Sequence, residues 1–206
     1  MKGAAIGLVV VLLTAFAAHA ASQAPASLDP NWPCQQIKIE HLSLATLWGG
    51  PPIDKYLTDW QNYPKAAALA HKLAERRVPV DQAKADIAAF AKAAGPDSQT
   101  QLLAFFAGLF SLLDQERFDV VQGLDRFGAR QKSYAAQIRG EINALHEAQD
   151  ASQPNQQNIQ TLGDKVYWDT RVFKSRDSMM SYACFVPDQI EQRLFALAQA
   201  TANLLP

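Results

Sequence analysis

Apolar residues recur along most of the chain with the three- and four-residue spacing of amphipathic helices. This pattern begins near Ile53 and is strongest after Ser98. Residues 149–158 are polar and rich in Gln and Asn, so we expect a loop there between two long helical runs. The second run ends at Pro187, and a terminal helix follows it. The first long run rests on Leu102, Phe105, Phe106, Leu109, Leu113, Phe118, Val121, Leu124, Phe127, Tyr134, Ile138, Ile142 and Leu145.

Prolines, glycines and capping residues mark the expected helix ends. Pro64 and Pro79 suit helix starts, and Gly95 followed by a proline suits a helix stop. Ser98 with Gln101 three residues later has the pattern of a capping box. Asp114 stands where the apolar spacing is interrupted, and we expect it to cap a break between two helices.

The segment from Asn31 to Pro52 lacks this helical pattern. It carries Trp32, Cys34 and Trp48, and it ends in two glycines and two prolines, which argue against a long helix. Local propensity does not order such a segment, so it needs tertiary contacts. We therefore expect an extended arm, with a short helix near 43–48, whose tryptophans pack on the helical body.

Long apolar stripes joined by short connections predict an all-α fold, a single-domain helical bundle with an extended N-terminal arm pinned by a disulfide. The expected divisions are a signal peptide at 1–20, the arm at 21–52 and the bundle at 53–206.

The first twenty residues have the three parts of a secretory signal peptide. Lys2 supplies a basic start, 4–17 is an uncharged apolar run, and Ala18-His19-Ala20 is a small-x-small cleavage site. We expect cleavage before Ala21 and export to the periplasm. No later apolar run approaches the roughly 20 residues that a transmembrane helix needs.

Cys34 and Cys184 are the only cysteines, so one intramolecular pairing exists. An exported protein meets an oxidising compartment, which favours a structural disulfide. The alternative is a reactive or metal-binding pair. The chain has no C-x-x-C motif, so neither a thioredoxin-type site nor a haem-attachment site of that kind is present.

Charge excludes some classes of partner. The formal net charge is −1, and loss of Lys2 with the signal peptide makes it −2. Nucleic-acid binding and polybasic attachment to anionic lipid both rest on clustered Lys and Arg, so we expect neither. The hydrophobic content of 49% fits an ordinary globular protein.

Motifs for catalysis, metals and cofactors are absent from the sequence. After the signal peptide His41, His71 and His146 are the only histidines, and none lies within four residues of another. The chain lacks G-x-S-x-G, the P-loop and G-x-G-x-x-G. We therefore predict no catalytic residues, no cofactor and no metal ligands.

The densest polar-aromatic stretch is 167–182. Within it, Trp168, Arg171 and Ser175 share one helix face. One interpretation is a solvated face with surface ion pairs worth about 0.3–0.5 kcal/mol each. The other is a partner-binding patch anchored by Trp168 and Arg171, because Trp and Arg are enriched at binding hot spots.

Two stretches resemble an uncharacterised family of exported helical proteins of Gram-negative bacteria. They are Asn31-Trp32-Pro33-Cys34-Gln35 and the region of Tyr182-Ala183-Cys184, continuing with Pro187, Ile190-Glu191 and Arg193-Leu194-Phe195-Ala196-Leu197. The resemblance implies a periplasmic location and supports pairing of the two cysteines. It brings no active site with it.

These observations leave two candidate functions, which belong to different classes. The first is a non-catalytic periplasmic accessory or interaction protein whose partner is another envelope protein. The second is a periplasmic protein that binds a small ligand or a metal in a pocket between helices. A solid core with an exposed apolar patch favours the first, and a buried cavity with convergent polar groups favours the second.

Overall fold

The protein is an all-α single domain, as the periodicity predicts. The computed structural model describes residues 29–206, and no strand occurs within that range. The predicted signal peptide at 1–20 and the start of the predicted arm lie outside the described residues. The helices are α1 Leu44–Leu47, α2 Asp54–Asp59, α3 Pro64–Ala74, α4 Val80–Ala94, α5 Ser98–Gln149, α6 Gln156–Ala183 and α7 Val186–Ala202, with 3-10 helices at Trp60–Asn62 and Gly95–Asp97.

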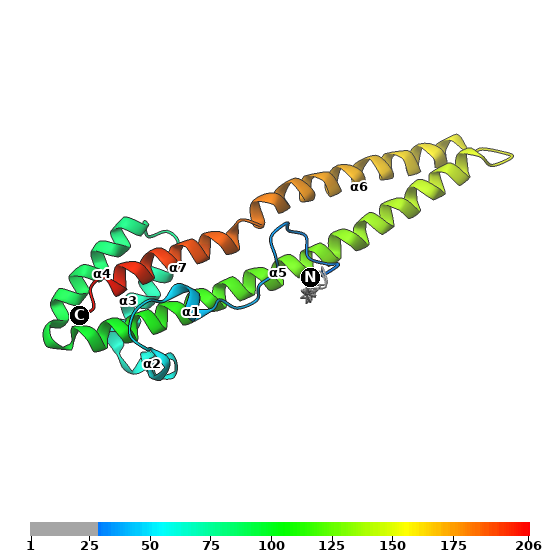
Figure 1. Ribbon diagram of the computed structural model, residues 1–206. Coiled ribbons are helices and arrows are strands. Elements are labelled where there is room, and N and C mark those ends of the chain that lie inside the picture. The colour runs from blue at the N-terminus through cyan, green and yellow to red at the C-terminus, as the bar shows by residue number, and fades with distance from the viewer. Residues whose placement is uncertain (1–28) are drawn as a thin grey trace, which may run out of the picture.

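Helix α5 is the spine of an elongated molecule (Figure 1). Its 52 residues span about 78 Å at 1.5 Å per residue. The first half of α5 packs with α2, α3, α4 and α7, and we call this part the head. The second half pairs antiparallel with α6 and projects away from the head (Figure 1); we call this part the hairpin. Residues 150–155 form its tip, at the polar loop expected from the sequence.

The head holds the main core because α5 is surrounded there. Residues 102–109 of α5 are all buried, as expected for a helix covered on every side. Gly108 lies in this stretch, and a Cβ there would stand 2.7 Å from the ring of Trp60. The close approach of the 3-10 helix that carries Trp60 therefore requires a glycine.

The hairpin is thinner and buries one seam only. Beyond Gly128 the only buried residue of α5 is Ile138, and the only buried residue of α6 is Met180. Two packed helices cannot cover more than one stripe of each, so the remaining faces of α6 meet solvent. Its exposed side chains are therefore available for contacts outside the fold.

The arm lies across α5, as predicted. Trp48 stacks on Phe106 with ring centroids 4.0 Å apart. Trp32 packs against a small cluster formed by Leu124, Met180 and Cys184. Both tryptophans therefore anchor the arm to the helical body, and the expected short helix near 43–48 is observed as α1.

Two expectations about helix ends are wrong. Asp114 caps no break, because α5 runs through it without interruption. Its carboxylate instead accepts hydrogen bonds from the arm, from the Leu42 amide at 2.7 Å and from the His41 ring at 2.8 Å. Ser98 is the first residue of α5, and Asp97 is its N-cap, with no side-chain capping bond. The preceding 3-10 turn leads directly into α5 and leaves no place for a capping box.

Candidate functional site

The two cysteines are joined at the boundary between head and hairpin. Cys34 of the arm and Cys184, the residue after α6, form a disulfide with a Cα–Cα distance of 5.6 Å. The side-chain amide of Gln36 donates to the Cys184 carbonyl, and the Trp32 indole donates to the Gln36 carbonyl at 2.7 Å. The bond therefore fixes the arm where α6 passes into α7, which is a structural role.

The inner edge of α6 carries a polar network that joins it to α5. Tyr134 of α5 donates to Asp169 at 2.9 Å, and Lys165 pairs with both Asp169 and Glu141 of α5. The Lys165 ammonium, and then the Tyr134 hydroxyl, lower the pKa of the Asp169 carboxyl below its ordinary value. Each polar partner of this network belongs to the hairpin, so the network sets how α6 lies on α5.

The opposite face of α6 carries an uncharged row of side chains that points to solvent. Its members follow one another at alternating steps of four and three residues, which places them on one face of the helix. All five are exposed, with exposed fractions of 58% for Trp168, 59% for Met179 and 77% for Tyr182. We call this row the outer stripe: Trp168, Val172, Ser175, Met179 and Tyr182.

Trp168 and Arg171, the two anchors of the partner-binding interpretation, are brought together at one end of the outer stripe. The Arg171 guanidinium carbon lies 5.7 Å from the centre of the Trp168 ring. Tyr167 stands edge-on to Trp168, with ring centroids 5.3 Å apart. A shallow cavity of about 400 Å³ adjoins them, lined by Val166, Tyr167, Thr170, Arg171 and Lys174. The site thus combines flat aromatic surface with positive charge.

The far end of the outer stripe lies within the polar-aromatic stretch 167–182, but it was not assigned to the predicted patch. Of the two adjacent methionines, Met180 is buried in the seam with α5, whereas Met179 is exposed on the outer stripe. Tyr182 and Phe185 are also exposed there, by 77% and 60%. Met179 and Tyr182 continue the four- and three-residue spacing that starts at Trp168. This spacing could have assigned both residues to the predicted patch.

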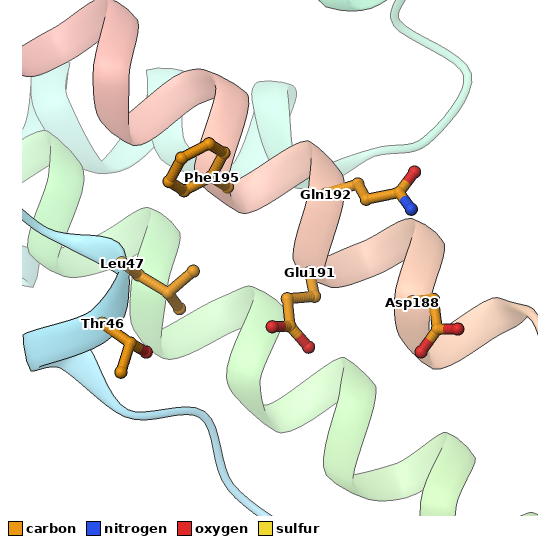
Figure 2. A pocket seen from close by; sticks show the side chains of 6 residues that line it. All are labelled: Thr46, Leu47, Asp188, Glu191, Gln192 and Phe195. Carbon is orange, nitrogen blue, oxygen red and sulfur yellow. The ribbon is translucent and has the colours of Figure 1, made fainter. Parts of the chain in front are cut away.

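The head has an open cavity of about 440 Å³ between α1 and α7 (Figure 2). Its acidic groups, Asp188 and Glu191, come from successive turns of α7, and Figure 2 shows Phe195 farther along the same helix. The Nε atom of Arg117, on α5, lies 3.9 Å from the Glu191 carboxylate. The remaining lining residues are Thr46, Leu47 and Gln192. The cavity contains neither a histidine nor a cysteine.

A second groove, of about 510 Å³, lies between α5 and the junction of α6 with α7. Its lining is almost wholly apolar: Val120, Gly123, Leu124, Phe127, Met179, Met180, Ala183 and Val186. The single charged residue on its rim is Arg76, whose guanidinium is already paired with Glu116 at 3.1 Å. Polar groups do not converge on this groove.

The histidines lie apart from one another. His41 stacks on Phe118 with ring centroids 4.7 Å apart, and His71 lies 5.5 Å from the ring of Trp60. Across residues 29–206, no group of three or more His, Cys, Asp or Glu side chains is placed to hold a metal ion. In the same range, no helix combines the length and apolar character needed to cross a membrane.

Comparison with protein-family models, with curated proteins and with solved structures finds no match for this chain. The resemblance noted from the two ends of the sequence therefore stays a prediction.

Proposed function

We propose that this protein is a non-catalytic accessory protein of the bacterial envelope that works in the periplasm and docks partners through the outer stripe. The observation that carries the proposal is the exposure of Trp168, Met179 and Tyr182 on one face of α6. Apolar surface of this extent on a soluble fold marks an interaction site.

The chemistry of the stripe supports a protein partner. Trp, Tyr and Arg are the residue types that contribute most to protein–protein binding. Trp168 and Arg171 already lie in contact range of each other, so little side-chain conformational freedom is lost when they bind. The solid core of the head, with Phe105 and Phe106 fully buried, holds the scaffold rigid.

Binding of a small apolar ligand is the second candidate, and the groove beside Leu124 and Phe127 favours it. The groove is apolar, and its one charged rim residue is engaged elsewhere in the fold. Titration of a solvatochromic apolar dye should show binding that is lost in a Gly123→Phe variant if the groove is occupied in solution.

A photo-crosslinking experiment tests the docking proposal. A benzoylphenylalanine placed at Trp168 should give a discrete adduct when the full chain is expressed and exported. The same group at Ser133, an exposed position on α5, is the matched control and should give none. Equal adducts at both positions, or none at either, would contradict the proposal. N-terminal sequencing of the exported protein should begin at Ala21.

A further inference from the structure

The outer stripe has the same order of side-chain sizes in both directions. Ser175 stands at its centre, Trp168 and Tyr182 lie seven residues to either side, and Val172 and Met179 lie between them. The sequence of types is aromatic, aliphatic, small, aliphatic, aromatic. A surface with this order is complementary to itself when a second copy lies antiparallel to it.

We propose that the occupant of the outer stripe is a second copy of this chain, with the two α6 helices antiparallel about a two-fold axis at Ser175. This inference rests on the proposed function, since it takes the stripe to be a docking face, and it names the partner. Around that axis, Trp168 of each copy lies opposite Tyr182 of the other. Val172, three residues before Ser175, lies one residue out of step with Met179 of the other copy, four residues after it, and the two side chains can still meet. A two-fold interface requires this reciprocal pairing.

The helical spacing fits such a pair. Steps of four and three residues keep the stripe facing a partner helix over four turns, with the shallow crossing angle of about 20° typical of paired helices. The small side chain of Ser175 lies at the closest point and lets the two backbones approach. Bulky residues on either side then fill the widening gap.

The exposed area matches what a stable dimer needs. Tyr167 and Phe185 flank the stripe and are 57% and 60% exposed. Together with the stripe, they offer roughly 700 Å² of mostly apolar surface on each copy, taking a large aromatic side chain as about 200 Å². If all of this surface is covered, two copies bury at most roughly 1,400 Å², within the range of specific interfaces.

Charge does not oppose the pairing. All five positions of the stripe are uncharged, so the two copies bring no like charges into direct contact there. Arg176 is held away from it, because its guanidinium lies 5.1 Å from the ring of Tyr134 on α5. Arg171 lies beside the stripe, against the Trp168 ring.

The two-fold axis gives a direct test. A cysteine placed on the axis lies opposite the same cysteine of the second copy. In the full chain both native cysteines are bonded, so Ser175→Cys adds the only free thiol. Mild oxidation at micromolar protein should convert this variant to a covalent dimer. Ser133→Cys, on α5, is the matched control and should stay monomeric under the same conditions. Equal dimer yields for the two variants would overturn the proposal.

Sedimentation equilibrium of the unmodified chain supplies the second measurement. The mass should correspond to two copies, and Trp168→Ala should raise the dissociation constant at least about 30-fold, as for a hot-spot residue. Phe195→Ala, an exposed aromatic on α7, should leave it unchanged. A monomer at all concentrations overturns the second-copy inference.

The crosslinking outcomes separate this inference from the proposed function. A Trp168 adduct of twice the chain mass supports both. A monomeric chain whose Trp168 adduct contains a different envelope protein overturns the second copy and leaves the docking function standing. A monomeric chain with no adduct overturns both.

Discussion

Gly128 of α5 lies directly against the backbone of Asn31 in the arm. A Cβ on Gly128 would stand 1.9 Å from the Asn31 carbonyl oxygen and 3.1 Å from the ring of Pro33. Glycine weakens a helix interior, yet here it lets an extended segment lie on the helix surface. Two features therefore hold the arm in place. One is Gly128 of α5, and the other is the disulfide at Cys34, three residues after Asn31.

We expect Gly128→Ala to destabilise the protein by about 1–3 kcal/mol, because the added methyl group must displace the arm backbone. Gly140→Ala, in the same helix, is the matched control. A Cβ at Gly140 meets nothing within 4 Å, so this variant should gain about 0.5–1 kcal/mol from helix propensity. Urea denaturation measures both. If the two variants are equally stable, the arm does not rest on Gly128.

We expect Cys34→Ser to lower the melting temperature markedly while far-UV circular dichroism shows the helical content kept. The bond joins residues 150 apart in sequence, and the chain-entropy model gives an upper figure of about 5 kcal/mol for such a loop. Cys184→Ser should have a similar effect, and the double variant should add little, because all three lose the same bond. Additive losses would show that the cysteines act separately.

The helical pattern predicted the fold class and most helix positions, because each helix buries a periodic stripe. The prediction of a helix break at Asp114 was wrong for a physical reason. Its polar side chain faces the arm, where the Leu42 amide and the His41 ring bind it. In the sequence, a carboxylate that accepts hydrogen bonds from a distant segment cannot be told apart from one that caps a helix end.

The candidate site was predictable in part. Trp168, Arg171 and Ser175 were placed on one face from their spacing alone, and the structure puts that face in solvent. Met179 and Tyr182 were missed, because an apolar residue in a periodic helix normally indicates core. Only the antiparallel pairing with α5 decides which side of α6 is buried, and sequence periodicity does not specify that partner.

Arg193 stabilises the head through hydrogen bonds to backbone carbonyls. Its buried guanidinium donates twice to the Leu73 carbonyl, at 2.7 and 3.0 Å, and once to the Val78 carbonyl at 2.8 Å. We expect Arg193→Met to cost about 2–5 kcal/mol, since two carbonyls lose their donor, one in the last turn of α3 and one in the connection to α4. Arg193→Lys should be intermediate. Arg171→Met, at an exposed site, is the control and should change the unfolding free energy little.

The polar network of the hairpin predicts a specific response to acid. The pKa of Asp169 is lowered in the folded protein, first by Lys165 and then by Tyr134. A carboxyl with a lowered folded pKa stabilises the fold above its unfolded pKa of about 3.9, and this contribution is lost as the pH falls through the folded value. Asp169→Asn should therefore lower the urea midpoint at pH 7 and flatten its acid dependence between pH 5 and the folded pKa.

Asp164→Asn is the control for that experiment, because Asp164 is an exposed acid on the same helix. The urea midpoint of Asp164→Asn should follow that of the unmodified protein at pH 7 and throughout the acid range. Lys165→Met should reproduce the flattened acid dependence of Asp169→Asn, since it removes the main cause of the lowered pKa. An unchanged acid dependence in both network variants would show that the hairpin is held by its apolar seam, through Ile138 and Met180, without help from these charges.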